Sequence, residues 1–70
     1  MKIIYKIYDE RTKQKFSVRQ LAEKSGVSKS QINDIENGKN HPTVYTLCLL
    51  SLALGINPCS LFEVSDIPDK

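Results

Sequence analysis

The residues of this sequence best suited to covalent or metal chemistry are Cys48, Cys59 and His41. A hydrolytic site needs a nucleophile, a base and an orienting group in a concave pocket, and a structural zinc site needs two pairs of cysteine or histidine ligands at short spacings. Two cysteines and a single histidine meet neither requirement. We therefore expect no catalytic residues, no metal site and no cofactor, and we interpret both thiols as buried apolar groups.

A second group of side chains offers hydrogen-bonding chemistry. Ile32 and Ile35 are spaced to share one side of a helix, which leaves the other side polar. The polar residues of this segment are Lys29, Ser30, Gln31, Asn33, Asp34 and Asn37. Base edges in the major groove of DNA present donors and acceptors, and an α-helix is slim enough to reach them. Such a helix has the chemistry needed to read a DNA duplex.

Charge is distributed unevenly along the chain. Nine of the ten lysines and arginines lie in residues 1–40, together with five of the eight acidic residues. A basic first half is compatible with a polyanionic partner, although a mixed solvated surface would also account for it.

Length and composition limit the protein to one small domain. Its 70 residues, 40% of them hydrophobic, can fill a single core. No apolar run approaches the roughly 20 residues of a membrane-spanning helix, and the chain does not open with a signal-peptide pattern. We expect a soluble, cytoplasmic protein without a membrane partner or an evident small-molecule ligand.

Capping residues divide the middle of the chain into two short helices. Ser17 and Gln20 form a capping-box pattern at the start of a helix over residues 18–25, and Gly26 is its expected end. Ser28 then caps a helix over residues 29–37.

Two more helices are predicted after Pro42. Thr43 is the expected cap of a helix over residues 44–54, which Gly55 ends. Asn57 and Pro58 open a short fifth helix, because proline suits the first helical position.

The first segment, residues 3–13, allows two interpretations. Ile3, Ile7 and Arg11 fall on one helical stripe. Residues 3–8, however, are rich in β-branched and aromatic side chains and could instead form a strand. We assign the segment as a helix, which makes the predicted fold all-α.

The two central helices have the features of a helix-turn-helix. Residues 25–28 form a tight glycine-containing connection, and Ala22 is small enough to let the helices cross closely. The apolar contact they would share consists of Leu21, Val27, Ile32 and Ile35.

On these residues the sequence resembles the Cro- and phage-repressor-like helix-turn-helix proteins of the XRE family. The matching segments follow in family order without insertion and together extend over about residues 7–62: they are 21–28, 35–39, Pro42, 46–47, 53–55 and 61–62. The resemblance implies a compact five-helix, lambda-repressor-like domain with the helix-turn-helix at its second and third helices. We place this domain in residues 1–63 and a short polar tail in residues 64–70.

The resemblance also implies roles for individual residues in binding double-stranded DNA. The residues at base-contacting positions are Lys29, Ser30, Gln31, Asn33 and Asp34. The residues at phosphate-contacting positions are Ser17, Arg19, Asn37, Lys39 and Asn40. The resemblance makes the predicted helix over residues 29–37 the recognition helix. Arg11 and Glu36 occupy positions that pair in some family members, and such a pair would fix this recognition helix against the first helix.

Two residues depart from the family pattern. Val18 stands where relatives often have a glutamine that contacts phosphate, so we expect Arg19 to take over that contact. Asp34 places a carboxylate toward the duplex, where phosphates repel it but a cytosine amino group can donate to it.

The predicted helix over residues 44–54 is apolar on two sides. Its expected core stripe consists of Val44, Leu47, Leu50 and Leu54. A second apolar stripe consists of Tyr45, Leu49 and Leu52, and Ile56 extends it. Two stripes cover more of the helix than one core requires, which favours a homodimer interface here. The alternative is extra burial beneath the ends of the same chain.

Together these features predict a sequence-specific DNA-binding transcriptional regulator, a repressor that occupies a palindromic operator as a homodimer. Two recognition helices related by a two-fold axis would read half-sites about 10 base pairs apart. The alternative is a protein-interaction module, such as an antitoxin or an anti-repressor, that acts through the apolar surface of residues 44–54.

Overall fold

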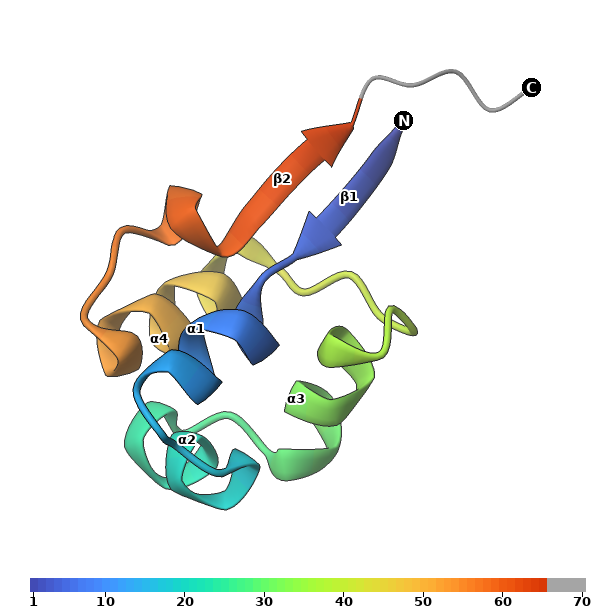
Figure 1. Ribbon diagram of the computed structural model, residues 1–70. Coiled ribbons are helices and arrows are strands. Elements are labelled where there is room, and N and C mark those ends of the chain that lie inside the picture. Colours follow the sequence, from blue (N-terminus) through green and yellow to red (C-terminus); the bar gives the residue numbers. More distant parts are fainter. Residues whose placement is uncertain (66–70) are drawn as a thin grey trace.

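The computed structural model describes residues 1–65, which form a bundle of short helices with a two-stranded ribbon projecting from it (Figure 1). The elements in chain order are β1 (Lys2–Tyr5), α1 (Ile7–Lys13), α2 (Val18–Ser25), α3 (Lys29–Glu36), α4 (Val44–Leu54), the 3-10 helix η1 (Pro58–Leu61) and β2 (Phe62–Ser65). The predicted helical fold is confirmed, with the ribbon as an addition to it.

Local capping determines where α2 begins and ends. The Ser17 hydroxyl accepts the Gln20 backbone N–H at 3.0 Å, and the Gln20 side chain accepts the Ser17 N–H at 2.9 Å. Gly26 closes the helix in a left-handed conformation with φ of 80°. The predicted bounds of α2 and its capping box are confirmed, because both depend only on neighbouring residues.

The bounds of α3 and α4 also follow their caps. Ser28 accepts the Gln31 N–H and Thr43 accepts the Thr46 N–H, each at 3.1 Å. The predicted bounds of α4 are confirmed, whereas α3 ends one residue earlier than predicted, with Asn37 as its C-cap.

The hydrophobic core lies between α1, α2, α3, α4 and η1. Its buried apolar members are Ile7, Leu21, Val27, Ile32, Ile35, Leu47, Leu50, Leu54 and Leu61. Val44 was predicted to join them but is 76% exposed. The buried side of α4 runs instead through Thr46 and Ser51 as well as its core leucines, which leaves Val44 in the first turn outside the core.

The predicted helix over residues 3–13 is wrong in its first part, because residues 2–5 form a strand of the ribbon. β1 pairs antiparallel with β2, and the cross-strand partners are Lys2 with Ser65, Ile3 with Val64, Ile4 with Glu63 and Tyr5 with Phe62. The β-branched and aromatic residues of this segment favour such pairing, so the helix begins only at Ile7.

β2 includes Val64 and Ser65, which were predicted to lie in the polar tail. Residues 66–70 of that predicted tail lie outside the described residues.

The cysteines differ from prediction as well. Cys48 is half-buried on α4, but Cys59 is exposed. Cys59 lies in η1, where the predicted fifth helix is a single 3-10 turn opened by the Asn57 side chain, which accepts the Cys59 N–H at 2.9 Å. A turn this short buries only Leu61. Among the described residues, no helix is long and apolar enough to cross a membrane.

Candidate nucleic-acid interface

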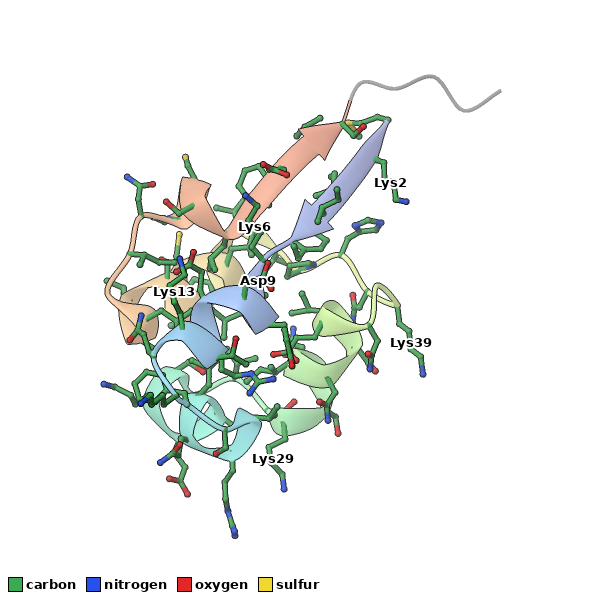
Figure 2. All side chains as sticks on the ribbon, viewed as in Figure 1. Lys2, Lys6, Asp9, Lys13, Lys29 and Lys39 are labelled. Atoms are coloured by element: carbon green, nitrogen blue, oxygen red, sulfur yellow. The ribbon has the colours of Figure 1, made fainter. Side chains whose placement is uncertain are left out.

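The polar side of α3 faces solvent. Ile32 and Ile35 are fully buried against the core, whereas Lys29, Ser30 and Asn33 on the other side are exposed. Figure 2 shows the Lys29 side chain projecting away from the helices. Gln31 and Asp34 are half-buried. The helix therefore presents the donors and acceptors of Lys29, Ser30 and Asn33 to solvent, while Gln31 and Asp34 are partly covered.

A buried ion pair joins α3 to α1. Arg11 Nε and Nη2 donate to the two carboxylate oxygens of Glu36 at 2.8 and 3.0 Å, and the side chains of the two residues are only 10% and 9% exposed. Arg11 Nη1 also donates to the Phe16 carbonyl at 2.9 Å. These bonds connect the end of α3 to the first helix and to the connection between α1 and α2.

The Arg11–Glu36 pair also stabilises the charge of Arg11. Hydrogen bonding to Glu36 raises the pKa of the Arg11 guanidinium above its already high ordinary value, and burial opposes this shift. A raised pKa means that the stabilisation from the charged arginine is lost only when the pH rises into the strongly alkaline range. Arg11 therefore remains charged at neutral pH, and its ion pair between α1 and α3 is intact there.

The turn between α2 and α3 is fixed from within. The Ser25 hydroxyl is buried and accepts the Val27 N–H at 3.1 Å, while Gly26 supplies the left-handed residue between them. A side chain at Gly26 would meet no atom within 4 Å, so glycine is needed here for its backbone conformation and not for space. The turn thus sets the angle between the two helices of the helix-turn-helix.

All five residues predicted to contact phosphates are exposed. Ser17 and Arg19 lie at the start of α2, whereas Asn37, Lys39 and Asn40 follow α3. The two groups come from the beginning of one helix and the end of the next. The Val18 side chain packs against the core and offers no polar contact.

The charged side chains of this surface are not neutralised by neighbours. The ion pairs formed by the described residues are Lys6–Glu63, Arg11–Glu36 and Lys13–Glu10. Arg19, Lys29 and Lys39 take part in none of them, and neither does Asp34. Unpaired cations beside exposed amide and hydroxyl groups are suited to bind phosphates and base edges.

The residues predicted to form a dimer interface are only partly accessible. Tyr45 and Leu52 are 73% and 78% exposed, but Leu49 and Ile56 are partly buried against the core of the same chain. Val44, predicted as a core residue, is exposed beside Tyr45. The exposed apolar surface of α4 thus consists of Val44, Tyr45 and Leu52.

Comparison with known proteins identifies the domain. The family model described as helix-turn-helix matches residues 7–61. The chain belongs to the XRE family of helix-turn-helix proteins. Among solved structures, this helix-turn-helix protein is similar to the restriction-modification controller protein C.AhdI from Aeromonas hydrophila. The TM-score is 0.75 at 28% sequence identity, over 77% of this chain and 82% of that one. No curated protein sequence matches the chain.

Membership of this family makes the helix-turn-helix protein a DNA-binding transcription regulator and not an enzyme. The family match begins at residue 7 and ends at residue 61, so both strands of the ribbon lie outside it. Lys2 and His41, which were not predicted to contact DNA, line one surface hollow with Gly38, the residue between the predicted phosphate contacts Asn37 and Lys39. The one feature of the sequence that indicated a ribbon here was the composition of residues 3–8, which allowed a strand.

Proposed function

We propose that this helix-turn-helix protein is a transcriptional repressor that occupies a palindromic operator as a homodimer. The observation that carries the proposal is the exposed polar side of α3, held from behind by Ile32 and Ile35 and by the Arg11–Glu36 pair. A rigid helix with free donors and acceptors can be placed in a major groove without first being ordered, which lowers the cost of binding.

The homodimer is supported by the apolar surface of α4. Val44, Tyr45 and Leu52 are large side chains that are each more than 70% exposed, and burying them against a second copy would be favourable. One domain of this size makes few phosphate contacts and binds weakly at physiological salt. Two copies related by a two-fold axis would bind half-sites about 10 base pairs apart with much higher affinity.

Repression would follow from occupancy alone. A dimer bound across a promoter blocks the access of RNA polymerase to the same DNA. The similarity to a restriction-modification controller protein supports a regulatory role in general. In a reporter strain, a promoter that overlaps the operator should lose transcription when the protein is expressed.

The operator itself can be found by selecting bound duplexes from a random pool. We expect an approximate palindrome with half-sites about 10 base pairs apart. On this operator, Lys29→Ala should weaken binding about tenfold, within the range expected for one base contact. Lys13→Ala, which removes a lysine from α1, should leave binding unchanged. Failure to enrich any common sequence would contradict the proposal.

The same apolar surface of α4 favours a second candidate, a protein-interaction module such as an antitoxin or an anti-repressor. Salt distinguishes the two functions. Binding to DNA loses affinity steeply as salt rises, with a slope of about 0.9 per phosphate contact, whereas an apolar protein contact barely responds. Lys29→Ala should have no effect on the protein contact.

A further inference from the structure

The ribbon brings the amino end of the chain to the loop that follows the recognition helix α3. Met1, Lys2 and Ile3 line a surface hollow together with Gly38 and His41. Gly38 lies directly between Asn37 and Lys39, two of the predicted phosphate contacts. In Figure 2, Lys39 and Lys2 both project to the right of the molecule, whereas Lys29 projects from its lower edge.

We propose that β1 provides a second phosphate-binding element, in which Lys2 and His41 contact the DNA backbone next to the phosphates bound by Lys39. The inference rests on the proposed DNA-binding function and extends its contact surface. It assigns to the ribbon a role that the matched family segment, residues 7–61, does not include.

The charge of Lys2 is available for such a contact. Lys2 is exposed and takes part in none of the ion pairs of the described residues. Lys6, at the base of the ribbon, differs because its Nζ lies 3.0 Å from Glu63 Oε2. Glu63, the acidic residue of β2, is therefore engaged by Lys6, and the cross-strand partner of Lys2 is the neutral Ser65.

His41 is oriented by Tyr5 of β1. The Tyr5 hydroxyl and His41 Nδ1 are 2.8 Å apart, and the ring centroids are separated by 5.7 Å. When Tyr5 donates its proton to Nδ1, the neutral imidazole carries its own proton on Nε2, which is then free to donate to a phosphate oxygen. Tyr5 is itself packed against the core, so it is a positioning residue that ties the loop to the ribbon.

The ribbon is anchored to the helical bundle at its base, and strand pairing with Ser65 places Lys2 at its far end. Tyr5 and Phe62 are cross-strand partners and both pack against the core. The Lys6 N–H donates to the Leu61 carbonyl at 2.7 Å where the two strands leave the helical bundle. A lysine on such a support loses less conformational entropy on binding than one on a free chain end.

The test compares Lys2→Gln with Lys13→Gln on the selected operator duplex. Both variants remove one positive charge, but Lys13 lies on α1 and is paired with Glu10. Lys2→Gln should lower the slope of log affinity against log salt by about 0.9 and weaken binding several-fold without changing the preferred sequence. Lys13→Gln should leave the slope unchanged. Ethylation interference identifies the phosphates whose modification weakens binding of each protein. The phosphate that no longer matters for Lys2→Gln should be next to the one that no longer matters for Lys39→Gln.

The outcomes separate this inference from the proposed function. Equal slopes for Lys2→Gln and Lys13→Gln, with the wild type binding DNA normally, would overturn the ribbon contact alone. A change in sedimentation for Lys2→Gln would also overturn it, because the ribbon would then be a contact between copies. A wild type whose binding to duplexes does not depend on salt would overturn both.

The role of Tyr5 is tested by a double-mutant cycle. Tyr5→Phe keeps the ring and removes the hydroxyl, and it should weaken DNA binding about as much as His41→Ala does. Because both changes act through one contact, the double variant should bind no more weakly than either single variant. A Tyr5→Phe protein that melts at a lower temperature but binds DNA like the wild type would assign Tyr5 a purely structural role.

Discussion

Arg11 donates three hydrogen bonds from a side chain that is 10% exposed, two of them to Glu36. Replacing Glu36 by glutamine removes the compensating charge and leaves the guanidinium buried without it. We expect Glu36→Gln to lower the free energy of unfolding by about 3 kcal/mol. Urea denaturation measures this, with Glu63→Gln as the control, because the exposed Lys6–Glu63 pair contributes at most about 1 kcal/mol. Equal losses in the two variants would contradict the role given to Arg11.

Asp34 is the acidic residue on the polar side of α3, and none of the ion pairs of the described residues includes it. A carboxylate near the duplex repels phosphates, so its benefit must come from discrimination between bases. Asp34→Asn should therefore raise the affinity for nonspecific DNA and reduce the preference for cytosine at one operator position by about 1–3 kcal/mol. Competition binding with operators altered at that position measures both effects. Lower affinity for nonspecific DNA would argue against this placement.

At the scale of elements, the turn between α2 and α3 depends on the left-handed backbone of Gly26, with φ of 80°. Gly26→Ala places a Cβ in open space, so the cost is backbone strain alone, about 1–2 kcal/mol. Gly26→Asn should cost less, because asparagine adopts this conformation more readily. Thermal unfolding of the two variants compares these costs. A loss for Asn as large as for Ala would show that the turn needs more than its backbone angle.

The helices whose ends are set by residues nearby in the sequence could be predicted from the sequence. Ser17, Gln20 and Gly26 specify α2 through contacts within a few residues. The polar side of α3 was predictable for the same reason, since helical periodicity separates it from Ile32 and Ile35.

The ribbon was harder to predict because it depends on a distant partner. Tyr5 pairs with Phe62 at the other end of the chain, and residues 3–8 alone fit a helix as well as a strand. Lys2 and His41 were missed as site residues because only this pairing places them together. Val44 was assigned to the core because periodicity gives the side of a helix and not how far the neighbouring elements extend along it.

At the scale of the whole molecule, the large exposed apolar side chains of the described residues lie mainly in two places, apart from Met1 and from Tyr8 on α1. Val44, Tyr45 and Leu52 lie on α4, while Ile4 and Val64 lie on the ribbon, which projects from the helical bundle (Figure 1). A contact through α4 would pair two compact bundles and hold two α3 helices in a fixed relation. A contact between copies through the ribbon would compete with the proposed DNA contact of Lys2, because both use the same strand. The arrangement favours α4 as the contact between copies.

This assignment predicts a matched pair of variants. Tyr45→Ser with Leu52→Ser should convert the dimer to a monomer and weaken operator binding about 100-fold, because each half-site is then bound independently. Both side chains are more than 70% exposed, so the folded monomer should keep its thermal stability. Ile4→Thr with Val64→Thr removes exposed apolar surface from the ribbon and keeps β-branched residues in the strands, so it should remain dimeric. Sedimentation equilibrium and operator titration measure the two properties. A Tyr45/Leu52 double variant that stays dimeric, or a monomeric one that binds the operator like the wild type, would contradict the α4 interface.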